Sequence, residues 1–145
     1  MPTVRKSAIV ERPAEAMFAL VDAVEHYPEF LPWCTATELI ERTDLTTHAR
    51  LHVDYHGLKT EFATVNRKQA PEWMHLDFTA GPFERFHGHW RFVALGDAGC
   101  HVEFTLDYAF QSRALEALLG PAFGHIAQTL LQRFVERASD SAGTP

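Results

Sequence analysis

Cysteine is scarce in this chain of 145 residues, and other features that would narrow its class are missing. Cys34 and Cys100 lie far apart and in no CxxC spacing, so the sequence does not predict a disulfide framework. No apolar run approaches the ~20 residues of a membrane-spanning helix, and the first residues are too polar for a signal peptide. We therefore expect a protein of the reducing cytoplasm.

An excess of positive charge is also absent. The 13 Lys and Arg residues against 19 Asp and Glu residues give a net charge of −6, with an isoelectric point near 5.8. An acidic chain does not present an extended basic groove, so we expect no specific DNA partner. A local basic patch stays compatible with this balance.

The sequence carries none of the usual catalytic signatures. It has no Gly-rich phosphate loop, no GxSxG turn and no HExxH motif. General acid–base chemistry would need a carboxylate inside the fold, whereas the strand carboxylates alternate away from the apolar side chains. These carboxylates are Asp54, Glu61, Asp77, Glu103 and Asp107. We therefore expect no catalytic residues and no required cofactor.

Aromatic and aliphatic residues are plentiful, and their spacing predicts a single domain over residues 1–138 with a flexible tail at 139–145. Residues 3–11 are typical of a strand and 13–21 of a short helix, since Pro13 suits a first helical turn. Residues 25–34 contain two prolines among large apolar side chains, which indicates a second short helix or turn.

From about residue 34 to 110 apolar and polar side chains alternate, which is typical of an antiparallel sheet with one covered face. We assign five strands there, around residues 48–55, 58–64, 74–80, 86–92 and 101–110, with a turn at Gly57 and a hairpin at 96–99.

The remaining chain is helical by its spacing. Apolar side chains recur three or four positions apart, and Ser112 is placed to cap the helix. They are Leu115, Leu118, Leu119, Ala122, Phe123, Ile126, Leu130 and Phe134. At Gly120-Pro121 we expect a kink or a restarted helix. The whole predicts an α+β fold: a curved antiparallel sheet of six to seven strands around a long C-terminal helix, with two short helices after the first strand.

Several short motifs carry a family resemblance over nearly the whole chain. They are YPEFLPWC at 27–34, FALV at 18–21, GPF at 81–83, WRF at 90–92 and FVERA at 134–138. With these, the chain resembles the coenzyme-Q-binding branch of the START-like superfamily. Its bacterial members are also called the ribosome association toxin family or polyketide cyclase/dehydrase-like proteins.

The resemblance implies a helix-grip (START/Bet v-like) fold with a tunnel between the sheet and the long helix. It implies non-catalytic binding of ubiquinone or a related polyprenyl lipid in support of respiration, with transient contact at the inner membrane. A first alternative is binding of the large ribosomal subunit to block subunit association. A second alternative is a polyketide cyclase or aromatase, which rests on fold analogy.

The expected tunnel residues are the inward side chains of the strands, the 27–34 segment and the terminal helix. They are Tyr27, Phe30, Leu31, Trp33, Leu51, Val53, Tyr55, Phe62, Phe78, Phe83, Trp90, Phe92, Phe104, Tyr108, Leu119, Phe123 and Ile126. Periodicity alone favours a solid core, and it is the resemblance that implies a tunnel wall. Tyr55 and Tyr108 have hydroxyls that suit a quinone carbonyl, and residues 27–34 suit either a lid or a structural plug.

Two sets of polar residues fall on the outer face of the predicted sheet. Seven histidines alternate outward, and we favour a solvated polar face over a metal site because no ligand of another type joins them at a reliable spacing. They are His48, His52, His56, His75, His87, His89 and His101. A ribosomal contact would use basic residues, whose ordinary role is solvated surface charge. The candidates are Arg50, Lys59, Arg67, Lys68, Arg85 and Arg91.

Overall fold

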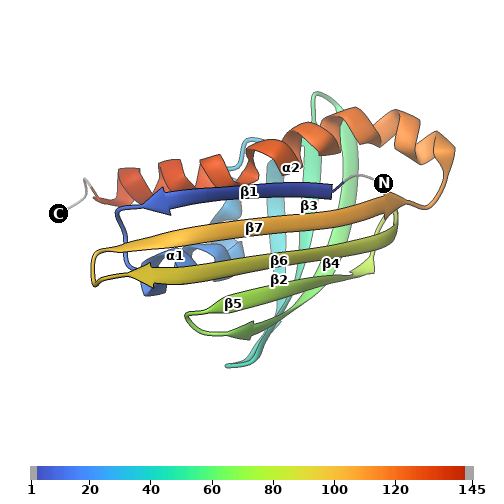
Figure 1. The fold of residues 1–145 in the computed structure, drawn as a ribbon. Coiled ribbons are helices and arrows are strands. Elements are labelled where there is room, and N and C mark those ends of the chain that lie inside the picture. Colours follow the sequence, from blue (N-terminus) through green and yellow to red (C-terminus); the bar gives the residue numbers. More distant parts are fainter. Residues whose placement is uncertain (1–2, 143–145) are drawn as a thin grey trace.

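A seven-stranded sheet and one long helix dominate the computed structural model, which describes residues 3–142 (Figure 1). The element order matches the sequence prediction. In chain order the elements are β1 Thr3–Val10, α1 Ala14–Asp22, the 3-10 helix η1 Val24–Glu29, β2 Cys34–Arg42, β3 Thr46–Tyr55, β4 Leu58–Gln69, β5 Trp73–Ala80, β6 Phe83–Leu95, β7 Gly99–Phe110 and α2 Arg113–Ala142.

All neighbouring strands are antiparallel, in the order β1-β7-β6-β5-β4-β3-β2. Strands β2 to β7 follow one another as a meander, and β1 joins the far side by pairing with β7. Figure 1 shows β2 and β3 running at a steep angle to β1, β7 and β6, so the sheet is strongly curved. The predicted helix-grip architecture is confirmed.

Alternation sets the inner face of the sheet as predicted. Every second residue of β7 from Cys100 to Phe110 is buried, and Trp90 of β6 stands opposite Phe104. Strand β2 was not assigned individually from the sequence, and it is exposed over most of its length. Register shifts between Cys34 and Ala36 and between Leu39 and Glu41 interrupt its pairing with β3. A bulge breaks the period of two, which explains why alternation did not reveal this strand.

The two short elements after β1 form where the sequence predicts them. Pro13 is the N-cap of α1, whose buried side chains include Met17, Phe18 and Val21. Pro28 lies inside η1 and has no N–H to donate, which agrees with the end of this helix at Glu29.

Helix α2 is capped by Ser112, whose Oγ accepts a hydrogen bond from the Leu115 N–H at 3.1 Å. The helix does not restart at Pro121, which lies inside one continuous helix. Leu118, assigned to the apolar stripe, is 56% exposed, whereas Leu131 is buried. The prediction for Leu118 is wrong because adjacent residues lie about 100° apart around a helix, so Leu118 falls at the margin of the stripe that buries Leu119.

The chain end departs partly from the expected tail. Helix α2 continues to Ala142, so the first four residues of the expected tail at 139–145 are helical. Residues 143–145 lie outside the described residues. Within the described part of the chain, no helix combines the length and the apolar character needed to cross a membrane.

Candidate ligand cavity

A small apolar cavity lies between the inner face of the sheet and α2. Strands β3 to β7 supply one wall, α2 the other, and Val24, Tyr27 and Trp33 close one side. The lining residues are Val24, Tyr27, Trp33, Leu51, Phe62, Thr64, Asn66, Leu76, Phe86, Trp90, Phe104, Leu106, Phe123, Ile126, Ala127, Leu130 and Phe134. Its volume of about 60 Å³ is far below the ~300–1,000 Å³ of a typical ligand site, so a ring-sized ligand requires the walls to move apart.

The structure brings together about half of the residues predicted for the tunnel. Those lining this cavity are Tyr27, Trp33, Leu51, Phe62, Trp90, Phe104, Phe123 and Ile126. A second void of about 10 Å³ nearer the start of α2 is lined by Val53, Tyr55, Phe83 and Leu119, and shares Phe123 and Ile126. Phe30, Leu31, Phe78, Phe92 and Tyr108 line neither space, so the Tyr108 hydroxyl does not face the main cavity.

Tight ring packing explains why the cavity is small. The Trp90 ring lies 4.5 Å from that of Phe104 and 5.3 Å from that of Phe134, between centroids. Phe62 lies 5.6 Å from Phe86 and 6.2 Å from Phe123. Edge-to-face and tilted pairs of this kind fill space efficiently, so most of the predicted tunnel is occupied by side chains.

Two side chains that line this cavity each carry a buried polar atom without a hydrogen-bond partner. The atoms are Nε1 of Trp33 and Oδ1 of Asn66, and the two side chains are only 7% and 3% exposed. A buried polar atom left unpaired costs about 1–3 kcal/mol relative to water. Sequence analysis missed Asn66 because alternation places it on the inner face of β4 but gives no reason to single out one polar side chain there.

The neighbouring segment, residues 27–34, covers one side of the cavity and is held from several directions. The Tyr27 hydroxyl donates to the carbonyl of Val21, and burial raises the pKa of this phenol well above its usual value. The Asp54 N–H donates to the Trp33 carbonyl at 2.9 Å. The segment is therefore anchored at both ends, and we call residues 27–34 the plug segment.

The middle of the plug segment is attached to α2 by surface contacts. An Arg137 guanidinium nitrogen lies 2.6 Å from a Glu29 carboxylate oxygen, and the guanidinium carbon lies 5.1 Å from the centroid of the Phe30 ring. Exposed ion pairs contribute little stability, so this attachment is the weakest that we find on the segment.

A buried ion pair between Lys68 and Asp22 corrects one sequence assignment. Lys68 was expected among the surface basic residues, but it is 6% exposed. Its Nζ lies 2.9 Å from Asp22 Oδ2 and 3.0 Å from Thr47 Oγ1, and Thr47 donates to Asp22 Oδ1 at 2.6 Å. The network ties the end of α1 to β3 and β4. The assignment was wrong because the partner carboxylate is 46 residues away in sequence.

The other basic candidates lie beside carboxylates on the outer face. The ion pairs are Arg50–Glu61 at 3.2 Å, Arg67–Asp77 at 3.3 Å, Arg85–Asp107 at 3.1 Å and Arg91–Glu103 at 3.9 Å. Lys59 is exposed. Neighbouring acids thus neutralise most of the predicted basic surface.

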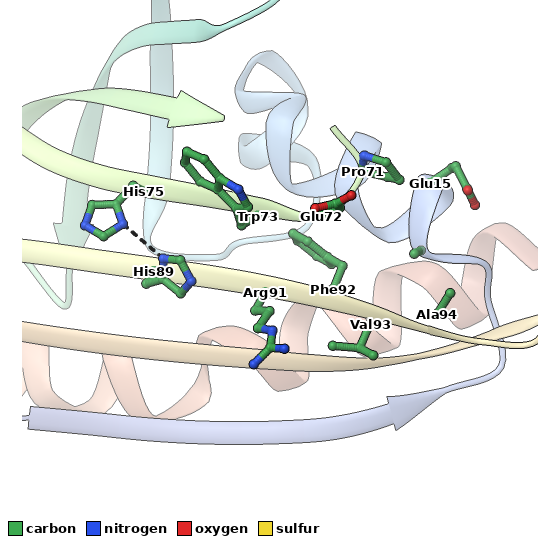
Figure 2. A pocket seen from close by; sticks show the side chains of 11 residues that line it. Glu15, Pro71, Glu72, Trp73, His75, His89, Arg91, Phe92, Val93 and Ala94 are labelled. Carbon is green, nitrogen blue, oxygen red and sulfur yellow. Dashed lines mark hydrogen bonds between the residues drawn. The ribbon is translucent and has the colours of Figure 1, made fainter. Parts of the chain in front are cut away.

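A larger groove of about 850 Å³ lies on the outer side of β5 and β6, near the start of α1 (Figure 2). Here the Nδ1 atoms of His75 and His89 lie 3.0 Å apart, and the Trp73 ring is stacked near His89. Burial, followed by the nearby charges of His75 and Arg91, lowers the pKa of His89. Within the described residues, no group of three His, Cys, Asp or Glu side chains is arranged to hold a metal ion.

The cysteines are both free and buried. Burial raises the pKa of the Cys34 thiol to about 11, and it also raises the pKa of Cys100. Neither thiol is activated as a nucleophile in this environment.

Comparison with known proteins fits this architecture. Residues 10–135 match the family model described as polyketide cyclase/dehydrase and lipid transport. The chain belongs to this family. The family assignment agrees with the START-like resemblance carried by the sequence motifs.

Individual relatives of the family carry different names. The ribosome association toxin RatA of Pseudomonas aeruginosa is 35% identical over 140 residues, covering 97% of this chain and 97% of that protein. The coenzyme Q-binding protein coq10 of Schizosaccharomyces pombe is 25% identical over 143 residues, covering 92% and 85%. The solved Zhui aromatase/cyclase from Streptomyces has a TM-score of 0.80 at 18% identity, with 99% of each chain covered. At that identity the likeness concerns the fold alone.

Proposed function

We propose that the protein binds an apolar, ring-bearing ligand of the quinone or polyprenyl-lipid class between the sheet and α2, without performing chemistry on it. The observation that carries this proposal is that Trp33 and Asn66, each with an unpartnered polar atom, line a largely apolar, aromatic cavity. Such a combination is typical of ligand sites, where a few polar groups orient a molecule held by apolar contacts.

The lining of the cavity supports binding over catalysis. Among the residues that the structure describes, the lining includes no Asp, Glu, His, Lys or Cys side chain, and the Tyr27 hydroxyl is engaged with the backbone. General acid–base catalysis needs a titratable group within hydrogen-bond reach of the substrate. The lipid-transport description of the family and the name of the coq10 relative support a binding role. We propose that the protein performs this role in the cytoplasm, with transient membrane contact for loading.

Detergent-free purification, lipid extraction and mass spectrometry test this proposal. We expect a ring-bearing lipid to accompany the wild-type protein and to be lost from an Ala127→Leu variant, whose larger side chain fills the cavity. Circular dichroism must show that the variant is folded. Wild-type protein that is empty and takes up no added quinone would contradict the proposal.

A second candidate function is binding of the large ribosomal subunit to block subunit association. It is favoured by the 35% identity to a ribosome association toxin over nearly the full length of both proteins. The net charge of −6 and the paired arginines of the outer face do not by themselves favour RNA contact, so such binding would depend on shape and local contacts.

Sucrose-gradient profiles test this second function. Added protein should raise the ratio of free subunits to monosomes, and the effect should weaken with salt. An unchanged ratio at a large molar excess of protein would count against it.

A further inference from the structure

The unpartnered atoms of Trp33 and Asn66 stand out from the rest of the described structure. Among the described residues, they are the buried side-chain nitrogen and oxygen atoms that lack a hydrogen bond, and both side chains line the same cavity. Buried polar groups in native proteins are nearly always paired, and each exception calls for an explanation. Their shared location points to the molecule that the cavity accepts.

The two atoms have complementary hydrogen-bonding capacity. The indole N–H of Trp33 can only donate, whereas the amide oxygen of Asn66 can only accept. A matching ligand must therefore present one acceptor and one hydroxyl or N–H donor. The surrounding rings of Phe62, Trp90 and Phe104 require that the rest of the ligand be flat and apolar.

We infer that Trp33 and Asn66 form a polar recognition pair for a phenolic ring of the hydroquinone class, which carries a hydroxyl donor together with an oxygen acceptor. The inference deepens the proposed function and rests on it. An oxidised quinone offers two acceptors, so it satisfies Trp33 but meets Asn66 only after the amide has turned over to donate through Nδ2. A plain aromatic hydrocarbon satisfies neither atom.

Water provides the alternative occupant of the two polar positions. The cavity of about 60 Å³ has room for about two water molecules at their volume in the liquid. A ligand that displaces ordered water without replacing its hydrogen bonds loses affinity. A ring that carries hydrogen-bonding groups should therefore bind more tightly than a plain hydrocarbon ring, although the hydrocarbon is the more hydrophobic ligand.

Calorimetric titration with a matched bicyclic series tests the inference. The probes are 4-methoxy-1-naphthol, with one donor and one acceptor, 1,4-dimethoxynaphthalene, with acceptors alone, and naphthalene, with neither. We expect the naphthol to bind about three- to tenfold more tightly than the dimethoxy compound, which in turn exceeds naphthalene by a similar factor.

Two variants assign each step of the series to one residue. Asn66→Leu should remove the advantage of the naphthol over the dimethoxy compound, and Trp33→Phe should remove the advantage of the dimethoxy compound over naphthalene. Both replacements put an apolar side chain in place of the unpaired polar group. The melting temperatures of the variants must confirm that they are folded. If either variant does not fold, the wild-type series still tests the inference.

The outcomes separate the inference from the proposed function. Equal binding of all three probes, or tightest binding of naphthalene, would overturn the recognition pair while leaving the cavity as a ligand site. No binding of any probe to the folded wild-type protein would overturn both.

Discussion

Asn66 and Lys68 stand two residues apart on the inner face of β4, where alternation would place apolar side chains. They meet this environment differently. Lys68 is neutralised by Asp22 and bonded to Thr47, whereas the Asn66 oxygen has no partner. The first residue therefore contributes to holding the fold together, and the second is available to a ligand.

Replacement of Lys68 by Met should destabilise the protein strongly. The Asp22 carboxylate would lose its main buried partner, and breaking a buried pair in this way typically costs about 3–5 kcal/mol. We expect about 2–3 kcal/mol, since Arg42 Nε remains 3.6 Å from Asp22. Urea unfolding measures this loss, and the exposed Lys59→Met serves as the control. Equal effects of the two variants would contradict a structural role for the Lys68 network.

Gly81 is required by both its conformation and its surroundings. Its φ is +144°, and a Cβ atom there would lie 2.7 Å from Cβ of Phe62. Gly81→Ala should therefore cost about 2–4 kcal/mol from backbone strain and overpacking. Gly96 also has a positive φ, of +73°, but open space surrounds it. Gly96→Ala should therefore lower the free energy of unfolding by about 1 kcal/mol. Thermal unfolding of both variants would contradict this account if Gly96→Ala were the less stable.

The lowered pKa of His89 predicts a specific pH dependence of stability. Burial and the charges of His75 and Arg91 favour the neutral form in the folded state, so the unfolded chain binds a proton more readily. The contribution of His89 is complete above about pH 6.5 and is lost as the pH falls through its folded pKa. His89→Gln should thus flatten the decline in unfolding free energy as the pH falls below about 6.5. A slope matching that of wild type, or of a His48→Gln control, would argue against this assignment.

At the scale of elements, we expect the plug segment to control access to the cavity, because Tyr27 and Trp33 close one side of it. Its ends are fixed by hydrogen bonds to Val21 and Asp54, while Glu29 and Phe30 are held to α2 through Arg137. The observed closed cavity therefore represents a state that must open for a ring to enter. Opening at the Arg137 contact costs less than unwinding either end.

Arg137→Gln should loosen the plug segment without unfolding the protein. Loss of an exposed ion pair worth up to about 1 kcal/mol raises the open population up to about fivefold. Hydrogen exchange should be faster for the Phe30 and Leu31 amides, whose hydrogen bonds to the Tyr27 carbonyl are 3.2 and 2.9 Å long. Glu136→Gln, an exposed position on the same helix, provides the control. Unchanged exchange in Arg137→Gln would show that this contact does not restrain the segment.

The elements also differ in how well the sequence predicts them. Strand β7 and the stripe of α2 follow directly from alternation and helical spacing, because one face of each is covered. Strand β2 did not, because register shifts interrupt its alternation, and Leu118 did not, because it lies at the margin of the apolar stripe. For the cavity, periodicity selected the aromatic walls but not Asn66 or the Lys68–Asp22 pair, whose roles depend on contacts between distant parts of the chain.

At the scale of the whole molecule, the curved sheet and α2 enclose an aromatic interior that is nearly full. The cavity of about 60 Å³ would have to expand to hold a quinone ring, so the proposed binding requires movement of the plug segment or of cavity side chains. The chain is similar both to a protein named for ribosome association and to one named for coenzyme Q binding. The shared fold thus leaves function to be determined by the site.

Intrinsic fluorescence of a Trp73→Phe variant tests ligand binding in the cavity most directly. Trp73 lies in the outer groove, so its removal leaves Trp33 and Trp90, which both line the cavity, as the only tryptophans. Titration with a short-chain ubiquinone, in oxidised and reduced form, should quench this fluorescence in a saturable manner. Quenching that stays linear and equals that of free tryptophan, up to the solubility limit of the quinone, would contradict the account.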